Sequence, residues 1–427
     1  MSLDLSKIKH VHFVGIGGIG ISAIARMMLS QGKIVTGQDM QDGQIVNDLK
    51  KLGATITIGQ SYKNIPNDVD LIVYTTAITT YDPEFFAKIK NHPSHHKTLD
   101  SHGMKTPIRS YPEMLGIVTE HKYTIAVSGT HGKTTTTAMI AKILVDTGKD
   151  PSVIVGSLLK ENNSNLIIGN SEYFVVEACE YERSFLNIKP KLLVITNIES
   201  DHLDYYKDLD DIKNAFKQLE AQSEKVIRDY SEYLNKIPKL KVPGLHNRLN
   251  AAAAYAVAKV LDIKDEAIQK SLSEFSGTWR RLEKRGISKT GTIIYDDYAH
   301  HPTEIRASLE ALREFYPKGE KKITVLFQPH LYSRTKALFA DFAKSFSGAD
   351  STYLLPIFFA REDKDESISS EKLASAIALT GDKAKAFPDF ESAEAYIKEL
   401  NLGENDIFVT MGAGEAYKVA DKVFHLA

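Results

Sequence analysis

The residues most suggestive of chemistry lie in the segment Ser128-Gly-Thr-His-Gly-Lys-Thr-Thr135, between an apolar run and a helical pattern. Glycines allow the N–H groups of such a loop to face a phosphate, and the start of the next helix adds positive potential. Lys133 can reach the β- and γ-phosphates, and the hydroxyl of Thr134 can bind Mg²⁺. The spacing is two residues tighter than in the common phosphate loop, but strand, loop, Gly-Lys-Thr and helix follow in the order that predicts a triphosphate site.

Acidic and histidine side chains follow two further apolar runs. Glu177 ends the run YFVVEA, and Asp201 and His202 follow the run KLLVITN. Because parallel strands end at one edge of a sheet, we expect these residues beside the phosphate loop, with Glu177 as a Mg²⁺ ligand. His202 could bind a second metal, although Mg²⁺ prefers oxygen ligands. The alternative is a solvated acidic loop in which Asp201 or Asp204 caps a helix.

A second glycine loop lies near the start of the chain. Gly15, Gly17 and Gly20 match G-x-G-x-x-G between a strand pattern and a helix pattern, and Asp39 ends the next strand pattern. Dinucleotide-binding folds place an acidic residue there for a ribose, but the same loop geometry suits any diphosphate, including a UDP-sugar. A turn without a ligand is a third possibility. A nicotinamide enzyme would have no need of the triphosphate loop, so we favour another diphosphate.

The remaining candidates also follow strand patterns or precede a helix. An amide at a helix start can contact a base edge, an imidazole can stack on it, and an arginine can bind a phosphoryl group or a carboxylate. Each residue type also occurs as a helix cap or as a surface side chain. The candidates are His246 and Asn247 before an alanine-rich run, Arg280 and Arg281 after the single tryptophan, Asp297, His300 and His301 after one apolar run, and His330 and Arg334 after the next.

Short apolar runs that alternate with helical patterns predict the elements that position these side chains. The predicted strands are 11–15, 33–39, 71–76, 123–129, 173–178, 191–197, 292–298, 323–328, 351–356 and 406–412, and the predicted helices include 21–29, 134–148, 210–224 and 250–261. The pattern restarts twice, which predicts three α/β domains: 1–115, 116–277 and 278–427. Residues 107–115 contain two prolines and are predicted to form a linker or a domain edge.

The composition excludes several classes of protein. The chain has 427 residues, 53 basic and 55 acidic, and a net charge of −2, so no bulk charge attracts nucleic acid or an anionic membrane. Its one cysteine, Cys179, cannot form an intrachain disulfide. No run approaches the ~20 apolar residues of a membrane span, and the first apolar run is too short for a signal peptide. We therefore expect a soluble, cytoplasmic protein without a nucleic-acid or membrane partner.

Seven motifs together resemble those of the Mur ligases, the ATP-dependent, amide-forming enzymes of peptidoglycan precursor synthesis. They occur in the family's order over essentially the whole chain: HFVGIGGIGISAIA, SGTHGKTTTT, TNIESDHLD, PGLHNRLNAAAA, GTWRRLE, DDYAHHPTEI and FQPHLYSRT. The resemblance implies a Rossmann-like N-terminal domain that binds a UDP-sugar, a central P-loop ATPase-like domain with a mostly parallel sheet, and a Rossmann-like C-terminal domain that binds an amino acid.

The reaction implied by the resemblance forms an acyl phosphate from ATP and a carboxylate, which an amine then attacks. The most similar branch joins L-alanine to UDP-N-acetylmuramate, as a monomer or homodimer. Alternatives are a family member that adds another amino acid or a recycled peptide and, more remotely, a nicotinamide-dependent oxidoreductase.

Residue roles are implied by the same resemblance, with ATP and Mg²⁺ as cofactors. ATP would contact Gly129, Thr130, His131, Gly132, Lys133, Thr134, Thr135, His246, Asn247, Arg281 and Asp297. Mg²⁺ would be held by Thr134 and Glu177, with His202 at a second ion. The UDP-sugar would contact Gly15, Gly17, Gly18, Gly20 and Asp39. The incoming amino acid would lie among His301, His330 and Arg334, and the catalytic set would comprise these three with Lys133, Glu177, His202 and Arg281.

Four features depart from the family's usual pattern. Leu331 replaces an arginine that could help to bind the amino-acid carboxylate. Gln60 stands where a histidine is common near the uridine. The run between His202 and His246 is short, which predicts a trimmed central domain. Phe216 occupies the position of a lysine that is carbamylated in some members, so we do not expect that modification.

Overall fold

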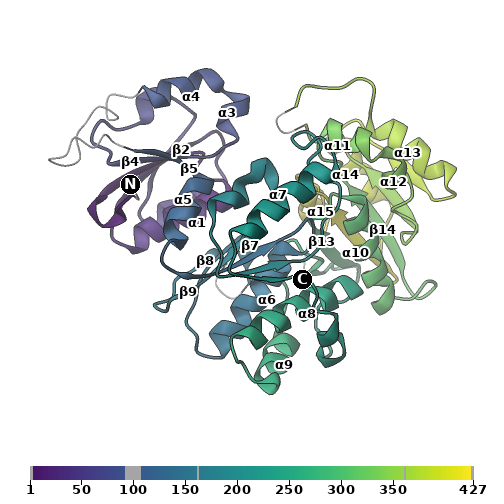
Figure 1. Ribbon diagram of the computed structural model, residues 1–427. Helices are drawn as coiled ribbons and strands as arrows, with labels where there is room; N and C mark the ends of the chain where they lie inside the picture. Colours follow the sequence, from purple (N-terminus) through teal and green to yellow (C-terminus); the bar gives the residue numbers. More distant parts are fainter. Residues whose placement is uncertain (1–2, 92–106, 161–162, 360–361, 425–427) are drawn as a thin grey trace. The chain divides into compact units, whose positions relative to one another are not determined.

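The computed structural model describes residues 3–91, 107–160, 163–359 and 362–424, and these residues form three β-sheets (Figure 1). The chain divides into two compact units. The first comprises Met1–Ser128, Leu144–Ile195 and Ala215–Ile227, and the second comprises Gly129–Ile143, Thr196–Asn214 and Arg228–Ala427. Two sheets belong to the first unit, and the third belongs to the second unit. The predicted α/β class is confirmed, whereas the domain boundaries near residues 115 and 277 stay a prediction.

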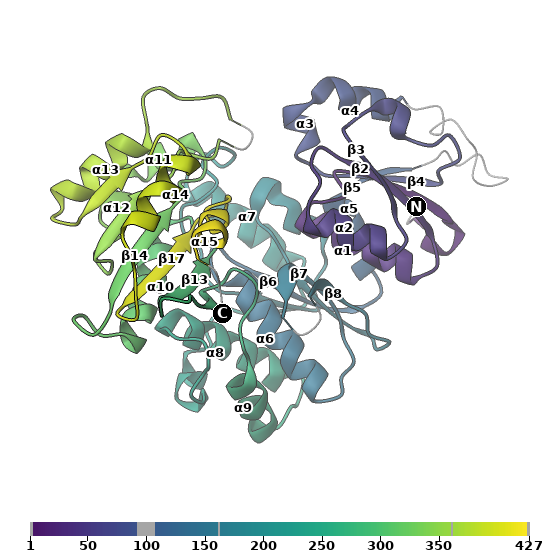
Figure 2. The ribbon, with the colours of Figure 1, turned by 180° about the vertical axis from the view of Figure 1, so that it is seen from behind.

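The N-terminal sheet has strand order β3-β2-β1-β4-β5, and all its pairs are parallel. This order is that of the first five strands of a Rossmann fold, as predicted. Helices α1 and α5 lie on one side of the sheet, and α3 and α4 lie on the other (Figure 2). The elements are η1 (Leu5–Lys7), β1 (His10–Val14), α1 (Ile19–Ser30), β2 (Ile34–Asp39), α2 (Gln44–Lys51), β3 (Thr55–Ile58), η2 (Tyr62–Asn64), β4 (Leu71–Tyr74), α3 (Ile78–Tyr81), α4 (Pro83–Lys90), β5 (Ile108–Ser110) and α5 (Tyr111–Thr119).

Of the two alternatives predicted for residues 107–115, a linker or a domain edge, the linker is wrong. β5 pairs in parallel with β4, and α5 follows at once. The Ser110 side chain accepts the N–H of Glu113 at 3.3 Å, while the Glu113 carboxylate accepts the N–H of Ser110 at 2.7 Å, which forms a capping box. Pro112 lies in the first turn, where its missing N–H leaves no helical hydrogen bond unmade. The two prolines flank regular structure here and do not interrupt it.

The central sheet has strand order β11-β10-β6-β9-β7-β8, and among the described residues only β7 and β8 pair antiparallel. The mostly parallel sheet is therefore confirmed. Its strands are β6 (Tyr123–Ser128), β7 (Ser152–Leu159), β8 (Ser164–Ile167), β9 (Tyr173–Glu177), β10 (Leu192–Ile195) and β11 (Lys225–Ile227). The helices of this part of the sequence are α6 (Lys133–Asp146), η4 (Tyr181–Asn187), α7 (Leu209–Ala221), η5 (Ser231–Lys236), α8 (Leu245–Val260) and α9 (Asp265–Glu274).

The C-terminal sheet has strand order β12-β13-β17-β14-β15-β16, with β12 antiparallel to β13 and the other described pairs parallel. Helices α10, α12 and α13 bury apolar side chains on one face of this sheet, and α14 and α15 do so on the other. The elements are β12 (Glu283–Ile287), β13 (Ile293–Asp297), α10 (Pro302–Phe315), β14 (Lys322–Phe327), α11 (Tyr332–Ala337), α12 (Phe339–Ala343), β15 (Ser351–Leu354), α13 (Ser370–Leu379), β16 (Ala384–Ala386), α14 (Phe390–Glu399), β17 (Asp406–Met411) and α15 (Tyr417–Val423). None of the helices in the described part of the chain has the length and apolar character needed to cross a membrane.

Arg280 is a structural residue of the C-terminal sheet. Its Nε donates to Asp296 at 2.7 Å, and its two Nη atoms donate to the carbonyls of Gly414 at 3.0 Å and Gly412 at 2.7 Å. The side chains of Arg280 and Asp296 are only 5% and 1% exposed. The sequence allowed two roles for Arg280, a ligand of a phosphoryl group or a surface side chain. The structure shows instead a buried side chain that holds parts of the sheet together.

Replacing Arg280 should therefore destabilise the protein. Arg280→Met leaves the Asp296 carboxylate buried without its cation, and we expect a loss of about 3–5 kcal/mol in the free energy of unfolding. Urea denaturation followed by circular dichroism measures this loss. Arg285→Met is the matched control, because Arg285 pairs with Asp421 at the surface and should cost at most about 1 kcal/mol. Equal losses in the two variants would contradict the structural role of Arg280.

Candidate active site

A cavity of about 370 Å³ in the second unit brings together eight residues predicted from the sequence to bind ATP. These residues are His131, Gly132, Thr134, Thr135, His246, Asn247, Arg281 and Asp297. The segment after β10 contributes Thr196, Asn197 and Glu199, and α10 contributes Thr303, Glu304 and Ser308. The cavity is therefore formed by the phosphate loop, a strand end, a helix start and the C-terminal part of the chain.

Two glycines give the phosphate loop its shape. Gly129 and Gly132 have φ values of +136° and +82°, which L side chains rarely adopt. A Cβ on Gly129 would lie 2.0 Å from Thr196 Oγ1, and one on Gly132 would lie 2.3 Å from Asn250 Oδ1. The loop is thus closely packed against the residues that follow β10 and against α8.

Hydrogen bonds from the segment after β10 hold the same loop. Asn197 Oδ1 accepts the N–H of His131 at 2.9 Å, and the hydroxyl of Thr196 donates to the carbonyl of His131 at 2.6 Å. Lys133 Nζ donates to the carbonyls of Gly129 at 2.6 Å and Thr130 at 3.0 Å, so the ammonium group lies at the loop as predicted. A flexible cation at this position can move to a phosphate without a change in the backbone.

Arg281 supplies a second positive charge beside the loop. Its Nη2 donates to Thr134 Oγ1 at 3.1 Å, and its guanidinium lies 5.0 Å from the centre of the Tyr298 ring. Arg281 therefore lies where the sequence analysis placed a ligand of the phosphates, in contrast to its neighbour Arg280.

The predicted nucleoside contacts are buried in the same cavity. Burial lowers the pKa of His246 to about 4, so its ring is neutral at pH 7 and can stack on a base. Burial raises the pKa of Asp297 to about 6, although Ser308 and the N–H of Ala299 donate to its carboxylate. Asn247 donates through Nδ2 to the carbonyl of Pro243 at 2.7 Å, which fixes its amide at the start of α8.

A smaller cavity of about 90 Å³ in the second unit contains His202 and Arg334. Arg334 Nε donates to Asp201 at 3.0 Å, and both side chains are buried. Burial would raise the pKa of Asp201, but the charge of Arg334, followed by that of His202, holds it well below its usual range. Arg334 Nη1 also lies 3.2 Å from His330 Nδ1. The structure thus brings His202, His330 and Arg334 together and adds Asp201, whose partner Arg334 was not predicted from the sequence.

Leu331 departs from the family pattern without exposing an apolar side chain. Its side chain is 1% exposed and its φ is +70°, which is unusual for a leucine. Its N–H donates to the carbonyl of Phe358 at 2.8 Å. In this chain position 331 therefore packs inward at the start of α11.

The predicted N-terminal glycine loop, Asp39 and Glu177 lie in the first unit. The N–H of Gly17 donates to Asp39 at 2.8 Å, and a Cβ on Gly15 would lie 2.4 Å from Thr75 Cγ2. Asp39 thus fixes the glycine loop, while its predicted contact with a nucleoside stays a prediction. Glu177 accepts the N–H of Gly156 at 2.7 Å.

The predicted Mg²⁺ ligands divide between the units. Glu177 belongs to the first unit, whereas Thr134 and His202 belong to the second. Their joint role in binding a metal therefore stays a prediction.

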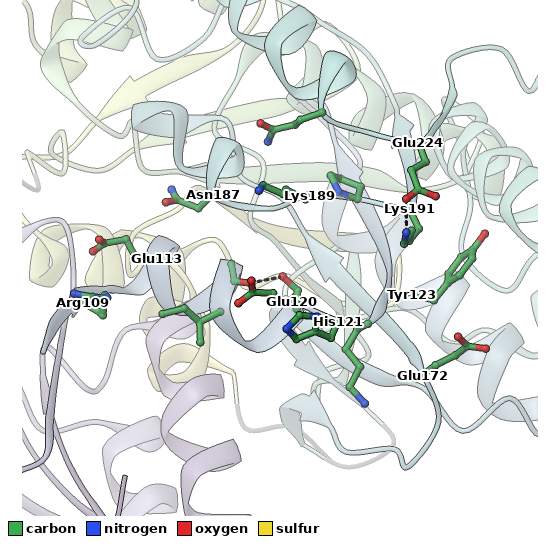
Figure 3. Close-up of a pocket in the computed structure, with 16 residues that line it drawn as sticks. Arg109, Glu113, Glu120, His121, Tyr123, Glu172, Asn187, Lys189, Lys191 and Glu224 are labelled. Carbon is green, nitrogen blue, oxygen red and sulfur yellow. Dashed lines mark hydrogen bonds and ion pairs between the residues drawn. The ribbon is translucent and has the colours of Figure 1, made fainter. Parts of the chain in front are cut away.

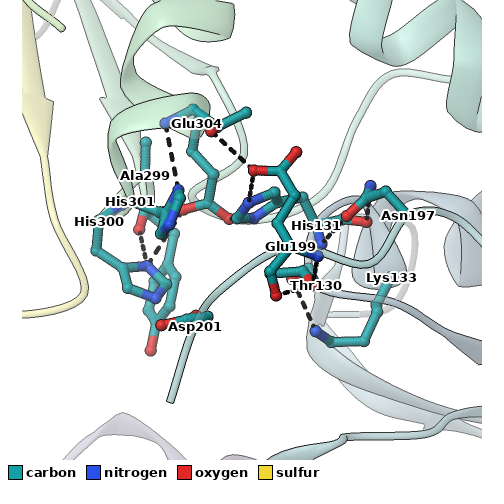
Figure 4. Close-up of polar contacts among 12 residues, drawn as sticks. Thr130, His131, Lys133, Asn197, Glu199, Asp201, Ala299, His300, His301 and Glu304 are labelled. Atoms are coloured by element: carbon teal, nitrogen blue, oxygen red, sulfur yellow. Dashed lines mark hydrogen bonds and ion pairs between the residues drawn. The ribbon is translucent and has the colours of Figure 1, made fainter. Parts of the chain in front are cut away.

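The acidic partners of His131 were not predicted from the sequence. Glu304 Oε1 lies 3.1 Å from His131 Nδ1, and Glu199 Oε2 lies 3.5 Å from His131 Nε2 (Figure 4). Glu304 is 173 residues from His131 in the sequence, so no local spacing rule connects the two. Polar side-chain atoms of His131, Glu199 and His301 lie within 4.8 Å of one another, so the three residues form one compact cluster.

A second cavity of about 880 Å³ lies in the first unit, and none of the predicted site residues lines it (Figure 3). It adjoins the amino ends of the central strands, at the opposite edge of the sheet from Ser128 and Glu177. Its charged lining includes Arg109, Glu120, Lys122, Glu172, Lys189 and Lys191. No motif in the sequence predicted this cavity, because its residues come from four separate segments.

Sequence comparison decides the family. The UDP-N-acetylmuramate–L-alanine ligase of Clostridium acetobutylicum is 40% identical to the chain, with 99% of each protein covered. The chain belongs to the Mur ligase family. Three family profiles agree: the family's catalytic domain over residues 10–123, its middle domain over 127–230 and its glutamate ligase domain over 280–414. The enzyme of the same name from Caldanaerobacter subterraneus is 38% identical, covering 99% of this chain and 98% of the other.

Solved structures confirm the three-domain α/β architecture of this Mur ligase. The UDP-N-acetylmuramate–alanine ligase of Thermotoga maritima superposes with a TM-score of 0.79 at 28% identity, covering 97% of this chain and 98% of the other. A murein peptide ligase from Psychrobacter arcticus shares the fold, with a TM-score of 0.68, 21% identity and coverage of 97% and 98%.

The alignment of this Mur ligase with a relative contains gaps in this chain. The alignment with the Clostridium enzyme spans 473 positions, whereas the chain has 427 residues. The prediction that the missing residues fall between His202 and His246 stays a prediction.

Arg281 gives a direct test of the larger cavity. Arg281→Ala removes a charged donor beside the phosphate loop, and a hydrogen bond to a charged group is worth about 1.5–3 kcal/mol. We therefore expect ATP to bind roughly 10- to 100-fold more weakly, as measured by isothermal titration calorimetry. Arg248→Ala is the control, because Arg248 is exposed and donates only to the carbonyl of Leu234. An unchanged ATP affinity in Arg281→Ala would place the phosphates elsewhere.

Proposed function

We propose that this chain is an ATP-dependent ligase that joins L-alanine to the carboxylate of UDP-N-acetylmuramate, in peptidoglycan precursor synthesis. The observation that carries the proposal is the 40% identity to an enzyme of that name over 99% of both chains. The cavity that joins the phosphate loop to Arg281, His246 and Asp297 supports it, because these residues match the needs of a nucleoside triphosphate.

The proposed reaction has two steps. A carboxylate oxygen of the sugar substrate attacks the γ-phosphorus of ATP, and ADP leaves. The amine of alanine then attacks the carbonyl carbon of the acyl phosphate, and inorganic phosphate leaves with the oxygen that formed the first bond. Because a free carboxylate is a poor acylating agent, the phosphoryl group serves to create a good leaving group. The protein mainly has to hold three substrates in line and to neutralise charge.

Lys133 and Arg281 are the cations proposed to act on the phosphates. Lys133 lies within the phosphate loop, and Arg281 donates to its Thr134. Both positive charges can stabilise the negative charge that develops on the leaving oxygen of ADP in the first step. His246 and Asn247 are proposed to bind the nucleoside, because a neutral ring and a fixed amide at the start of α8 suit a base.

Mg²⁺ is proposed as the metal of the reaction. The hydroxyl of Thr134 and the carboxylate of Glu177 are oxygen donors, which is the ligand type that Mg²⁺ prefers. The imidazole of His202 fits this ion less well and is proposed only for a second metal position. When bound, Mg²⁺ supplies positive charge to the β- and γ-phosphate oxygens.

The incoming amino acid is proposed to bind beside Arg334. This guanidinium and His330 are close together, and Asp201 holds the arginine in place. A cavity of about 90 Å³ at this position suits a small side chain. Leu331 packs inward, so Arg334 is left to bind the carboxylate of the amino acid. The UDP-sugar is proposed to bind the glycine loop that Asp39 fixes in the first unit.

Phosphate release with Mg-ATP and UDP-N-acetylmuramate tests this function. The assay compares L-alanine, glycine, L-serine, D-alanine and a tripeptide, and mass spectrometry identifies the product. We expect release that depends on L-alanine and a product heavier than the sugar substrate by one alanyl residue. Release with the tripeptide alone would move the protein to the recycling type of ligase. If none of the acceptors gives phosphate release, the proposed sugar substrate is contradicted.

Lys133 should be essential for that reaction. Lys133→Ala removes the ammonium group from the phosphate loop, and we expect phosphate release to fall by at least about 10³-fold, because charge neutralisation carries most of phosphoryl transfer. Steady-state assays measure the loss, and circular dichroism verifies the fold. Lys142→Ala, on the same helix about two and a half turns further along, is the matched control and should retain activity. An equal loss in both variants would argue against a specific role for Lys133.

A further inference from the structure

His131 connects three segments of the second unit. It lies in the phosphate loop, and its backbone is held by Thr196 and Asn197 from the segment after β10. Its side chain reaches Glu199 of that same segment and Glu304 on α10 (Figure 4). Thr303, next to Glu304, also donates to Glu199 at 3.0 Å. A closed set of contacts thus joins the phosphate loop to the first turn of α10.

The ring of His131 is largely buried and lies between the two carboxylates. Its side chain is 12% exposed, with one ring nitrogen directed to each acidic group. On a third side, the ring of His301 lies at a centroid distance of 4.7 Å and an angle of 47°. His301 accepts the N–H of Thr303 through Nδ1, and its Nε2 lies 3.3 Å from the carbonyl of Ser200. This arrangement suits a neutral His301 and a charged His131, because a positive ring is attracted to both carboxylates, through the hydrogen bond with Glu304 and the 3.5 Å ion-pair contact with Glu199.

We propose that His131 is a positioning residue of the phosphoryl-transfer step, which acts as a cationic bridge from the phosphate loop to Glu199 and Glu304. The inference rests on the proposed function, because it assigns His131 a task in the use of ATP. The bridge fixes the loop before nucleotide binds and keeps a positive charge at the base of the phosphate site. It also holds the carboxylates of Glu199 and Glu304 in place and offsets part of their negative charge, which would otherwise repel the triphosphate.

Electrostatics supports the geometry. Burial would lower the pKa of His131, but the hydrogen bonds and charges of Glu199 and Glu304 outweigh it and raise that pKa to about 9. The hydrogen bond with His131 is the main cause that lowers the pKa of Glu199 to about 2. The pKa of Glu304 lies well below its usual value, because the charges of His300 and His131 outweigh its burial.

Other charged groups face this cluster from each element around it. Lys133 lies on the phosphate loop, Asp201 on the segment after β10, His300 and His301 before α10, and Arg281, His246 and Asp297 around the cavity. The pKa of His300 is lowered to about 4 and that of His301 is also lowered, in both cases chiefly by burial. Neither ring therefore changes its protonation near pH 9, where His131 loses its proton.

The sign of the pH dependence follows from the raised pKa. The bridge is complete below the ordinary pKa of histidine and is lost as the pH rises through about 9. In the wild-type protein we expect kcat/KM for ATP to fall above pH 9. Glu304→Gln removes one negative charge with little change in shape, which should lower the pKa of His131. In this variant kcat/KM for ATP should therefore begin to fall at least one pH unit lower than in the wild type.

Nuclear magnetic resonance measures the proton directly. The full chain is labelled with ¹³C in its histidine rings, and the His131 signal is assigned by its loss in His131→Asn. We expect that signal to titrate near pH 9 in the wild type and at least one unit lower in Glu304→Gln. A titration between pH 6 and 7, or no change in Glu304→Gln, would overturn the proposal. If His131→Asn does not fold, the comparison of wild type, Glu304→Gln and Glu199→Gln still decides it.

Kinetics separates positioning from a merely structural role. His131→Asn should lower kcat/KM for ATP by about 10²-fold and should lose the limb near pH 9, while His131→Arg should recover at least 10-fold of that loss. His121→Asn is the matched control, because His121 is exposed, lies in the first unit and should leave the profile unchanged. Loss of activity with an unchanged alkaline limb would contradict the bridge. If the ligase assay gives no turnover with any acceptor, the proposed function fails, while the titration still reports on His131.

Discussion

The charge on the His131 ring is the constraint on which the second unit depends. A triphosphate site needs positive charge, but two acidic side chains, Glu199 and Glu304, lie at its edge. The protonated imidazole lies between the two carboxylates, offsets part of their negative charge and joins the phosphate loop to α10. Lys133 and Arg281 then contribute positive charge beside the loop, through the Lys133 bonds to the carbonyls of Gly129 and Thr130 and the Arg281 bond to Thr134.

The sequence predicted the chemistry of the loop better than it predicted its partners. Gly129, Gly132 and Lys133 could be predicted because they lie close together in one recognisable loop motif. The structure shows why each glycine is required. The three parallel-dominated sheets followed from the alternation of apolar runs and helical patterns. Short strands such as β5 and β16 escaped notice, because three residues carry too little pattern. The two prolines before Leu115 were interpreted as a linker, yet they flank a strand and begin a helix.

Long-range pairs could not be predicted from spacing. Glu304 meets His131 across 173 residues, and Arg280 meets the carbonyls of Gly412 and Gly414 across more than 130. Asp201 and Arg334 form a buried pair across 133 residues. Family resemblance placed several of these residues in one site, but it did not show which of them hold the others. That distinction separates Arg280, which supports the sheet, from Arg281, which faces the loop.

The central claim is that a carboxylate is activated by phosphoryl transfer and then captured by alanine. The most direct test uses UDP-N-acetylmuramate labelled with ¹⁸O in both carboxylate oxygens, together with ATP, Mg²⁺ and L-alanine. Mass spectrometry of the released phosphate should show one ¹⁸O atom for each product formed, since the leaving phosphate carries a carboxylate oxygen. Phosphate without the label would show that water or another group attacks ATP, which would contradict the account.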